Sequence, residues 1–340
     1  MSWLVVGGAG YIGSHVVRRL RADGREVVVL DDLSTGVRER LPADVPLVVS
    51  GLDRATIAAT LRRYAVTGVV NLAARKSAPE SVAQPLWYYE QNVEGMRALL
   101  EAAVDVDVRQ VLLSSSAAVY GRPPGTRVTE ETPTEPINPY GETKLMCEWM
   151  LRAAGVAHGV SWIALRYFNI VGSTDPVCAD TSGDSLFPRV FQRLTTGRPA
   201  VVTGRHFPTR DGTGVRDYVH VADVADAHAA AIARLESGRC ADVYNVGTGS
   251  GYSVLEVLAA VREVTGLPVE VEVLPPRPGD PPEVVAAVDK IGREMSWHAR
   301  NDLYDMVRST WQAWRPMVTA PTRPARRRRS PAPGRRQRVR

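Results

Sequence analysis

The sequence predicts an α/β protein in which a doubly wound parallel sheet is joined to a smaller C-terminal α/β lobe. Three observations support this prediction. Short apolar runs alternate with helical patterns, a glycine-rich segment follows the first apolar run, and the alternation loosens after about residue 170. Near-continuous apolar strands that alternate with helices are typical of a parallel sheet that helices cover on both faces.

The first thirty residues have the order strand, glycine turn, helix, strand. Residues 4–6 form a short apolar run, and the glycine-rich segment 7–13 follows it directly. Apolar residues then recur at helical spacing through residues 11–22, and the apolar run that begins at Val27 ends in two acidic residues. This order is the pattern of a parallel βαβ unit, the building block of a Rossmann-type fold.

The alternation continues to about residue 170. It predicts strands at 45–49, 68–70, 111–113 and 162–165, and helices at 55–64, 88–104 and 140–154. The second half predicts helices at 185–196, 222–236, 253–265 and 302–314, and strands at 242–246 and 269–273. We expect residues 1–170 to form a dinucleotide-binding domain, with the chain returning to its sheet near 217–221 and 243–246. Residues 171–316 would then be mainly a substrate-binding lobe.

Composition excludes several classes of protein. The chain has 340 residues, of which 44% are hydrophobic and 23% charged, as in ordinary globular proteins. No apolar run is long enough to span a membrane. Three cysteines, Cys147, Cys178 and Cys240, are too few and too far apart for a disulfide framework or a cysteine-rich zinc site. We therefore expect a cytoplasmic protein with no metal and no membrane partner.

The basic charge of the chain is concentrated at its C-terminal end. Residues 321–340 hold nine arginines and no acidic residue, and without them the formal net charge changes from +5 to −4. This segment is also rich in proline and nearly devoid of large apolar side chains. We expect residues 317–340 to be a disordered tail, with no nucleic-acid partner.

The glycine-rich segment fits the pattern G-x-G-x-x-G at Gly8, Gly10 and Gly13. In this pattern the first glycine permits a tight turn, the second lets the backbone approach a pyrophosphate, and the third lets helix and strand pack closely. Asp31, at the end of the next strand, is the acid expected on the adenosine ribose. Asp32 adds a second negative charge and no Arg or Lys adjoins the pair, so NAD is favoured over NADP.

Tyr140 and Lys144 lie four residues apart in a predicted helix and therefore share one helix face. A free tyrosine is a poor base at neutral pH. An ammonium beside it stabilises the phenolate and lowers the pKa of the phenol. The tyrosine can then accept a hydroxyl proton while hydride leaves the same carbon. The pair follows a predicted strand that ends in three serines, the last of which is Ser116.

Five segments in this order carry a family resemblance. They are Gly7–His15 (GGAGYIGSH), Ser114–Gly121 (SSSAAVYG), Asn138–Gly141 (NPYG), Arg166–Asn169 (RYFN) and Asp211–Val221 (DGTGVRDYVHV). The chain resembles the UDP-glucose 4-epimerase family, a branch of the extended short-chain dehydrogenases/reductases, from residue 3 to about residue 314. The resemblance implies an isomerase that interconverts UDP-galactose and UDP-glucose through a transient 4-keto sugar with tightly bound NAD, as a homodimer.

The resemblance also implies roles for matching positions. Ser116, Tyr140 and Lys144 would be the catalytic residues. The cofactor would contact Gly7, Gly8, Gly10, Tyr11, Ile12, Gly13, Asp31, Asp32, Lys76, Asn92, Tyr140, Lys144 and Tyr167. The nucleotide sugar would contact Ser116, Asn169, Ser185, Leu186, Arg216, Arg277, Asp280 and Val284. The arginines suit a pyrophosphate, because guanidinium groups form charge-assisted and bidentate hydrogen bonds with it.

Four positions bear on the choice of sugar and on one cofactor contact. The family often has Asp before an apolar residue near the adenine, whereas this chain has Leu52 before Asp53. Ser185 replaces a common Asn, and Thr203 stands where an aromatic residue often lies near the uracil. Val284 stands where some members carry Tyr beside the C2 substituent of the sugar, and its smaller side chain leaves room for an N-acetyl group.

Three other functions remain to be weighed. A 4-epimerase of another UDP-sugar, such as an N-acetylhexosamine, a pentose or a uronate, would need the same catalytic residues. A nucleotide-sugar 4,6-dehydratase is disfavoured, because Ala117 and Ala118 stand where such enzymes carry proton-transferring Asp-Glu. A non-catalytic NAD-sensing regulator is the remote alternative, since degenerate members are expected to lose the tyrosine or the lysine.

Overall fold

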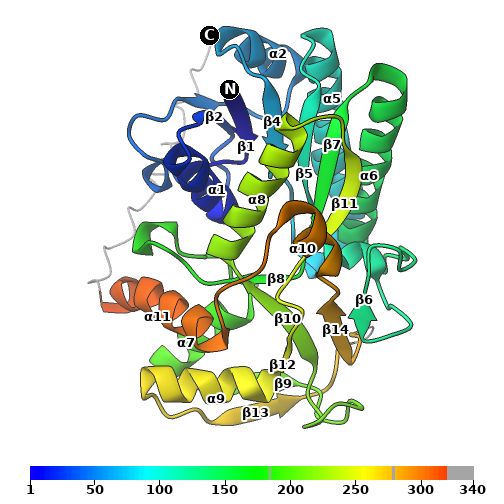
Figure 1. Cartoon of the computed structure of the whole chain (residues 1–340). Coiled ribbons are helices and arrows are strands. Elements are labelled where there is room, and N and C mark those ends of the chain that lie inside the picture. The colour runs from blue at the N-terminus through cyan, green and yellow to red at the C-terminus, as the bar shows by residue number, and fades with distance from the viewer. Residues whose placement is uncertain (184, 278–279, 320–340) are drawn as a thin grey trace, which may run out of the picture.

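Seven parallel strands form the large sheet of the computed structural model, which describes residues 1–183, 185–277 and 280–319 (Figure 1). The predicted tail therefore lies almost entirely outside the described residues. In spatial order the strands are β3 (Leu47–Val49), β2 (Glu26–Asp31), β1 (Ser2–Val6), β4 (Gly68–Asn71), β5 (Gln110–Ser116), β7 (Ser161–Tyr167) and β11 (Ala241–Val246). The strand order reverses between β1 and β4, which is where doubly wound sheets bind ligands at the carboxyl ends of the strands.

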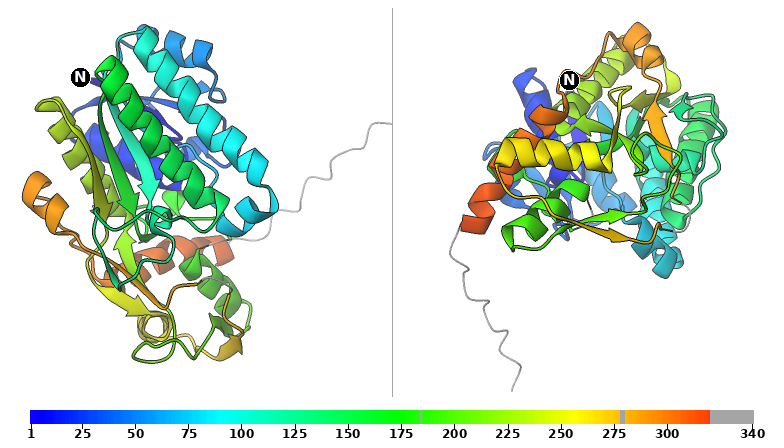
Figure 2. Two further views of the ribbon diagram at one scale, coloured as in Figure 1. Left: turned by 90° about the vertical axis from the view of Figure 1, so that its right-hand side faces the viewer. Right: turned by 90° about the horizontal axis from the view of Figure 1, so that it is seen from below.

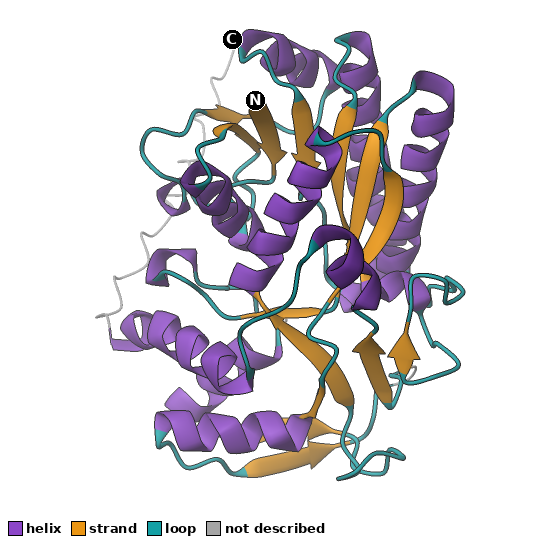
Figure 3. Ribbon diagram, in the orientation of Figure 1, coloured by secondary structure: helices purple, strands orange, loops and turns teal. Residues whose placement is uncertain are grey.

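Helices cover both faces of this sheet, and the predicted fold class is confirmed (Figure 3). One face packs against α1 (Tyr11–Ala22) and α8 (Val221–Glu236). The other face packs against α2 (Arg54–Arg63), α5 (Gly95–Asp105) and α6 (Pro139–His158). Because both faces are buried, the central strands carry apolar residues on both sides, which explains the continuous apolar runs in the sequence.

The long helix predicted at 88–104 is interrupted. After α3 (Ala78–Ala83), the chain forms α4 (Pro85–Tyr88), a π-helical segment at Tyr89–Glu94, and then α5. A π-helical segment holds one more residue per turn than an α-helix and often lies at a functional site. Here it contains the buried Asn92.

A second lobe lies below the large sheet in the left view of Figure 2. Its sheet has the strand order β12 (Gly251–Ser253), β10 (Val215–His220), β14 (Glu283–Ala286), β6 (Arg127–Val128), and β8 (Asn169–Val171) also pairs with β10. The expectation that residues 217–221 return to the large sheet is wrong. The edge of that sheet beside β7 is occupied by β11, and β10 pairs with β8 instead. The expected return near 243–246 is confirmed as β11.

Three helices and a two-stranded sheet complete the second lobe around a separate apolar core. They are α7 (Leu186–Thr195), α9 (Val254–Thr265), α11 (Leu303–Thr319), β9 (Ala200–Thr203) and β13 (Val271–Leu274). A short helix, α10 (Asp289–Met295), packs back on the large domain through Ile291. None of the helices in the described part of the chain has the length and apolarity that crossing a membrane requires.

Candidate active site

The glycine loop between β1 and α1 leaves no room for side chains. Gly7 has a positive φ of 77°, and a Cβ on it would lie 2.7 Å from the Ala73 nitrogen. The turn is thus made by Gly7 rather than by Gly8, whose backbone packs against Val29. A Cβ on Gly13 would lie 2.2 Å from the Gly7 oxygen, so close packing of helix and strand requires glycine there, as predicted. Gly10 begins α1 without a side-chain cap, which leaves the first helical N–H groups available to an anion.

Two acidic residues at the end of β2 lie on the side of the site across from the glycine loop. The Asp31 carboxylate accepts hydrogen bonds from the backbone nitrogens of Ala9 and Leu33, each 2.9 Å long. It therefore ties the glycine loop to the turn after β2. Burial raises the pKa of Asp31, and these two backbone bonds oppose the increase. The exposed Asp32 accepts from the Ser34 nitrogen and hydroxyl, at 2.9 and 2.7 Å.

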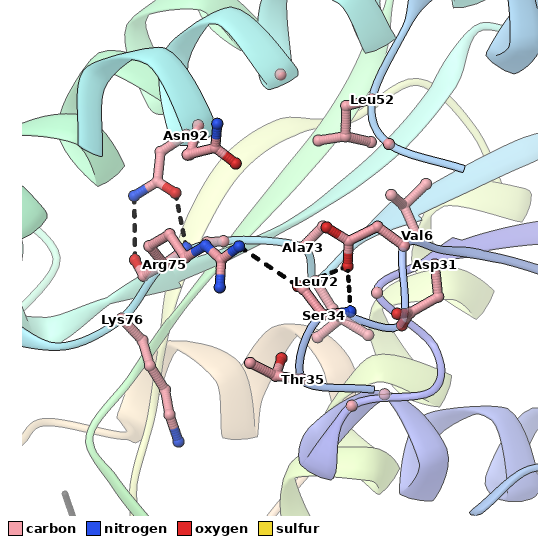
Figure 4. A pocket seen from close by; sticks show the side chains of 18 of the residues that line it. Val6, Asp31, Ser34, Thr35, Leu52, Leu72, Ala73, Arg75, Lys76 and Asn92 are labelled. Carbon is pink, nitrogen blue, oxygen red and sulfur yellow. Dashed lines mark hydrogen bonds between the residues drawn. The ribbon is translucent and has the colours of Figure 1, made fainter. Parts of the chain in front are cut away.

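A cavity of about 880 Å³ lies between the glycine loop, the end of β2 and the segment after β4 (Figure 4). This volume is within the usual range for ligand and cofactor sites. Most of the predicted cofactor residues line it, namely Gly7, Gly10, Tyr11, Ile12, Gly13, Asp31, Asp32, Lys76 and Asn92. Gly8, Tyr140, Lys144 and Tyr167 are not among its lining residues. Leu52 and Asp53 both line the cavity, and the Asp53 carboxylate caps α2 by accepting from the Thr56 nitrogen at 2.8 Å.

Asn92 links this cavity to helix α6. Its side-chain oxygen accepts from the Arg75 nitrogen at 2.8 Å, and its side-chain nitrogen donates to the Arg75 oxygen at 3.1 Å. The same nitrogen donates to the Thr143 hydroxyl on α6 at 2.9 Å. The cavity wall and the helix that carries Tyr140 and Lys144 are therefore held in one arrangement.

Ser116, Tyr140 and Lys144 come together where β5 ends and α6 begins. The Asn138 side chain caps α6 by accepting from the Gly141 nitrogen at 2.9 Å, and Pro139 occupies the first helical position. These two residues place Tyr140 in the first turn and Lys144 one turn later. The Tyr140 phenol hydrogen-bonds the Ser116 side chain, and the Lys144 ammonium donates to the Ser114 carbonyl at 2.7 Å.

Burial has the largest effect on the pKa values of Tyr140 and Lys144. It raises the pKa of Tyr140, and the hydrogen bond with Ser116 opposes the increase. It also lowers the pKa of Lys144 to about 8. The expected lowering of the Tyr140 pKa by Lys144 is not found, because desolvation is the larger effect and the ammonium is directed at the Ser114 carbonyl.

Tyr167 lies behind this group, at the end of β7. Its phenol is 2.6 Å from His228 Nε2 of α8 and also hydrogen-bonds the Ser114 side chain. The residue is buried, and burial raises the pKa of its phenol. The structure thus directs the Tyr167 hydroxyl toward α8 rather than into the cavity.

Apart from Ser116, which ends β5 of the large sheet, the residues expected to contact a sugar nucleotide lie in the second lobe. Pairing of β10 with β14 places Arg216 opposite Val284, and Arg216 lies 4.0 Å from the Asp280 carboxylate. The exposed Arg277 is close enough to oppose the charge of Arg216, whose pKa burial also lowers. Val284 and Ala117, which is next to Ser116, pack against the same small apolar cluster. This cluster therefore connects the strand opposite Arg216 with the end of β5.

Three other expected contacts, Asn169, Ser185 and Leu186, and the departure at Thr203 lie on separate elements. Asn169 is exposed at the start of β8, and Thr203 ends β9 opposite Leu274. The Ser185 hydroxyl donates to Asp180 at 2.7 Å, just before Leu186 begins α7. Asp180 itself lines the cavity, so this bond connects α7 with the cofactor site.

Sequence reasoning missed two arginines of the cavity. Arg40 is buried and donates to the Ala179 carbonyl at 2.9 Å and to the Thr181 hydroxyl at 3.2 Å, which holds the segment before α7 against the cavity. Arg75 reaches the Ser34 hydroxyl at 3.4 Å. No Arg or Lys is next to Asp31 and Asp32 in the sequence, as expected. In the fold, however, Arg75 comes close to this pair, because it reaches the hydroxyl of Ser34, which itself bonds Asp32.

A Rossmann-type sheet with a glycine loop before α1, an acid ending β2 and a Ser-Tyr-Lys group where β5 ends defines a nicotinamide-dinucleotide enzyme of the short-chain dehydrogenase/reductase class. Residues 3–247 match the sequence model of the NAD dependent epimerase/dehydratase family. The chain belongs to this family, and its cofactor is NAD. The glycine cradle and the uncapped start of α1 fit that cofactor.

Curated proteins and solved structures resemble the chain over nearly its whole length. A UDP-glucose 4-epimerase of Azospirillum brasilense is 42% identical over 92% of this chain and 91% of its own. The structure of a UDP-glucose-4-epimerase from Stenotrophomonas maltophila, with bound NAD and formylated UDP-arabinopyranose, has a TM-score of 0.89 at 38% identity and covers 93% of this chain and 98% of its own. The UDP-Glc/GlcNAc 4-epimerase of Campylobacter jejuni has a TM-score of 0.83 at 33% identity, with coverage of 93% and 99%.

Proposed function

We propose that the protein is a UDP-glucose 4-epimerase, an isomerase that interconverts UDP-galactose and UDP-glucose. The observation that carries the proposal is the group formed by the half-buried Ser116 and Tyr140 and the buried Lys144, whose helix is tied through Thr143 and Asn92 to the cofactor cavity. The names of the relatives from Azospirillum brasilense and Stenotrophomonas maltophila support the same substrate.

In this proposal Tyr140 accepts the proton of the sugar 4-hydroxyl, and Ser116 hydrogen-bonds the same oxygen. Bound NAD supplies the hydride acceptor at C4 and later the donor. Loss of the proton and the hydride gives a 4-keto sugar, which turns within the site. Hydride addition to its other face and return of the proton from Tyr140 invert C4, and the reaction has no net oxidation. Lys144, whose ammonium donates to the Ser114 carbonyl, positions the cofactor ribose.

The cofactor residues follow from the cavity. We propose that Gly7, Gly10, Tyr11, Ile12 and Gly13 hold the pyrophosphate of NAD at the start of α1, while Gly8 acts through its packing on Val29. Asp31 and Asp32 face the adenosine ribose, Lys76 and Asn92 line the opposite wall, and Tyr167 supports the nicotinamide end from behind Ser114.

The sugar nucleotide is proposed to lie between the two lobes, with residues 171–316 supplying most of its contacts. Asp280 lies 4.0 Å from Arg216, and Arg277 is near enough to oppose the charge of Arg216. Both arginines suit the pyrophosphate of UDP. Asn169, Ser185 and Leu186 are proposed to contact the rest of the substrate. A second candidate function is 4-epimerisation of UDP-N-acetylhexosamines, favoured by the small side chain of Val284, which packs against the same apolar cluster as Ala117, and by the name of the Campylobacter jejuni relative.

A homodimer is proposed from helix α6. Trp149 and Val156 are 54% and 86% exposed on this helix, and Leu86 of the neighbouring α4 is 81% exposed. Large apolar side chains exposed on two neighbouring helices support an interface between two copies of the chain. The cysteines Cys147, Cys178 and Cys240 are free thiols, which supports a reducing, cytoplasmic location.

The test is conversion of UDP-galactose by the purified protein without added NAD, followed by separation of the products. Removal of the proton acceptor in Tyr140→Phe is expected to lower kcat about 10²- to 10⁴-fold. Tyr304→Phe is the matched control, because this exposed phenol bonds Glu263 far from the site. Activity of Tyr140→Phe within tenfold of the wild type would contradict the assignment.

A further inference from the structure

The cofactor cavity contains a cationic side chain to which no role has yet been given, that of Arg75. The cavity is lined by more acidic than basic side chains. The acids are Asp31, Asp32, Asp53, Glu80, Glu90, Glu94, Glu101 and Asp180, and the bases are Arg40, Arg54, Arg75, Lys76 and Arg97. A dinucleotide brings further negative charge through its phosphates. A cationic side chain of the cavity that is not already paired can offset this charge and so contribute to binding.

Most of these cations are already engaged. Arg54 pairs with Asp105 and Glu101, and Arg97 pairs with Glu94 and Glu101. Arg40 is buried against backbone carbonyls. Within the described part of the chain, Arg75 and Lys76 form no ion pair, and the side chain of each donates one hydrogen bond, to a serine hydroxyl at 3.4 Å.

The backbone of Arg75 is held rigidly while its side chain crosses the cavity. The Asn92 amide bonds both the nitrogen and the carbonyl oxygen of Arg75. From this fixed base the guanidinium lies 4.8 Å from the centre of the Trp87 ring. It also reaches toward Ser34, as Figure 4 shows. The side chain therefore spans from the wall after β4 to the bank that carries Asp31 and Asp32.

Its neighbour Lys76 points in another direction. The Lys76 ammonium lies 3.4 Å from the Ser182 hydroxyl, in the segment before α7. The side chains of Arg75 and Lys76 thus reach two different sides of the same cavity, one near Ser34 and the other near Ser182. Because a guanidinium is planar, it can stack on Trp87 and donate hydrogen bonds at the same time, which a lysine in its place could not do.

We propose that Arg75 is a clasp that retains the bound dinucleotide. Stacked on Trp87, the guanidinium closes over the adenosine side of the cavity and provides positive charge to the cofactor. The clasp limits how fast NAD leaves the protein, and it takes no part in hydride or proton transfer.

The test is the rate of cofactor release, measured without any sugar. The protein is loaded with NADH and chased with excess NAD⁺, and the loss of bound-NADH fluorescence is followed. Loss of a hydrogen-bonding charge is expected to accelerate release about 10- to 100-fold in Arg75→Gln. Trp87→Leu is expected to accelerate release about two- to fivefold, as for a lost cation–π contact. Arg75→Lys should fall between the wild type and Arg75→Gln.

Arg97→Gln is the matched control, because Arg97 lines the same cavity but is paired with two glutamates. Its release rate is expected to stay within twofold of the wild type. The thermal midpoint of the NAD-free Arg75→Gln protein should also be unchanged, since the side chain is only partly buried. NADH release from Arg75→Gln within twofold of the wild type would overturn the proposal. This outcome is independent of sugar turnover, so it is distinguishable from failure of the proposed epimerase activity.

Discussion

Replacement of Lys144 by Met is expected to separate activity from stability. Lys144 is 4% exposed, and burial lowers the pKa of its ammonium from 10.5 to about 8. A difference of about 2.5 pKa units corresponds to about 3 kcal/mol by which the fold disfavours the charged form. Below pH 8 both the folded and the unfolded chain carry the proton, so the whole cost is present.

Between pH 8 and 10.5 the unfolded chain binds more protons at this position than the folded chain. Stability therefore rises with pH in this window because of Lys144, and the cost is gone above pH 10.5. Lys144→Met does not titrate. At pH 7 we expect the variant to be at least as stable as the wild type although its epimerase activity is lost. From pH 8 to pH 10 the wild type should gain about 2 kcal/mol relative to the variant.

The assay is urea unfolding of both proteins at pH 7, 8, 9 and 10. The raised pKa of Tyr140 is caused by burial and not by Lys144, so it affects both proteins alike and cancels in the difference. The pKa of Cys147 does not cancel, because the charge of Lys144 lowers it, and the thiol therefore contributes to the difference at the upper end of the pH range. Lys76→Met is the control, since Lys76 is exposed and its pH profile should run parallel to that of the wild type. Parallel profiles for Lys144→Met and the wild type would refute the reasoning.

Three further predictions concern the cofactor loop, the sugar site and the tail. Gly13→Ala forces a Cβ to 2.2 Å from the Gly7 oxygen and should abolish NAD retention and lower the melting temperature, whereas Gly51→Ala, also in the cavity and with nothing within 4 Å, should do neither. Wild-type protein should epimerise UDP-N-acetylglucosamine, and Val284→Tyr should lose this activity but keep UDP-glucose turnover. If the wild type forms no N-acetyl product at saturating substrate, Val284 does not leave room for an N-acetyl group and the prediction is refuted. Truncation after Ala320 should leave kcat/KM and Tm unchanged, and a large fall in either would show that the arginine-rich segment contacts the body.

The sequence predicted those parts of the fold that depend on local pattern. The strands of the large sheet are apolar runs that are buried on both faces. In the glycine loop, a side chain at Gly7 or Gly13 would collide with the backbone, so only glycine fits at these two positions. Both features are visible in a few consecutive residues. Strand partners are not local, and β10 therefore was expected in the wrong sheet.

In the site, too, the residues that a local pattern links could be predicted, and those that only the fold brings together could not. Tyr140 and Lys144 are one helical turn apart, and their meeting with Ser116 follows from parallel strand order. Arg75 could not be assigned, because its neighbours Trp87 and Ser34 come from segments on either side of it in the chain. The pKa of Tyr140 was also misjudged, since its burial depends on packing that no short motif encodes.

The most direct test of the central claim uses UDP-galactose labelled with deuterium at C4. Purified protein without added NAD is incubated with this substrate in ordinary water, and the product is separated and analysed by mass spectrometry. The account predicts UDP-glucose that retains the label at C4, because the hydride leaves and returns within one site. Loss of the label to water, or the absence of UDP-glucose, would contradict it.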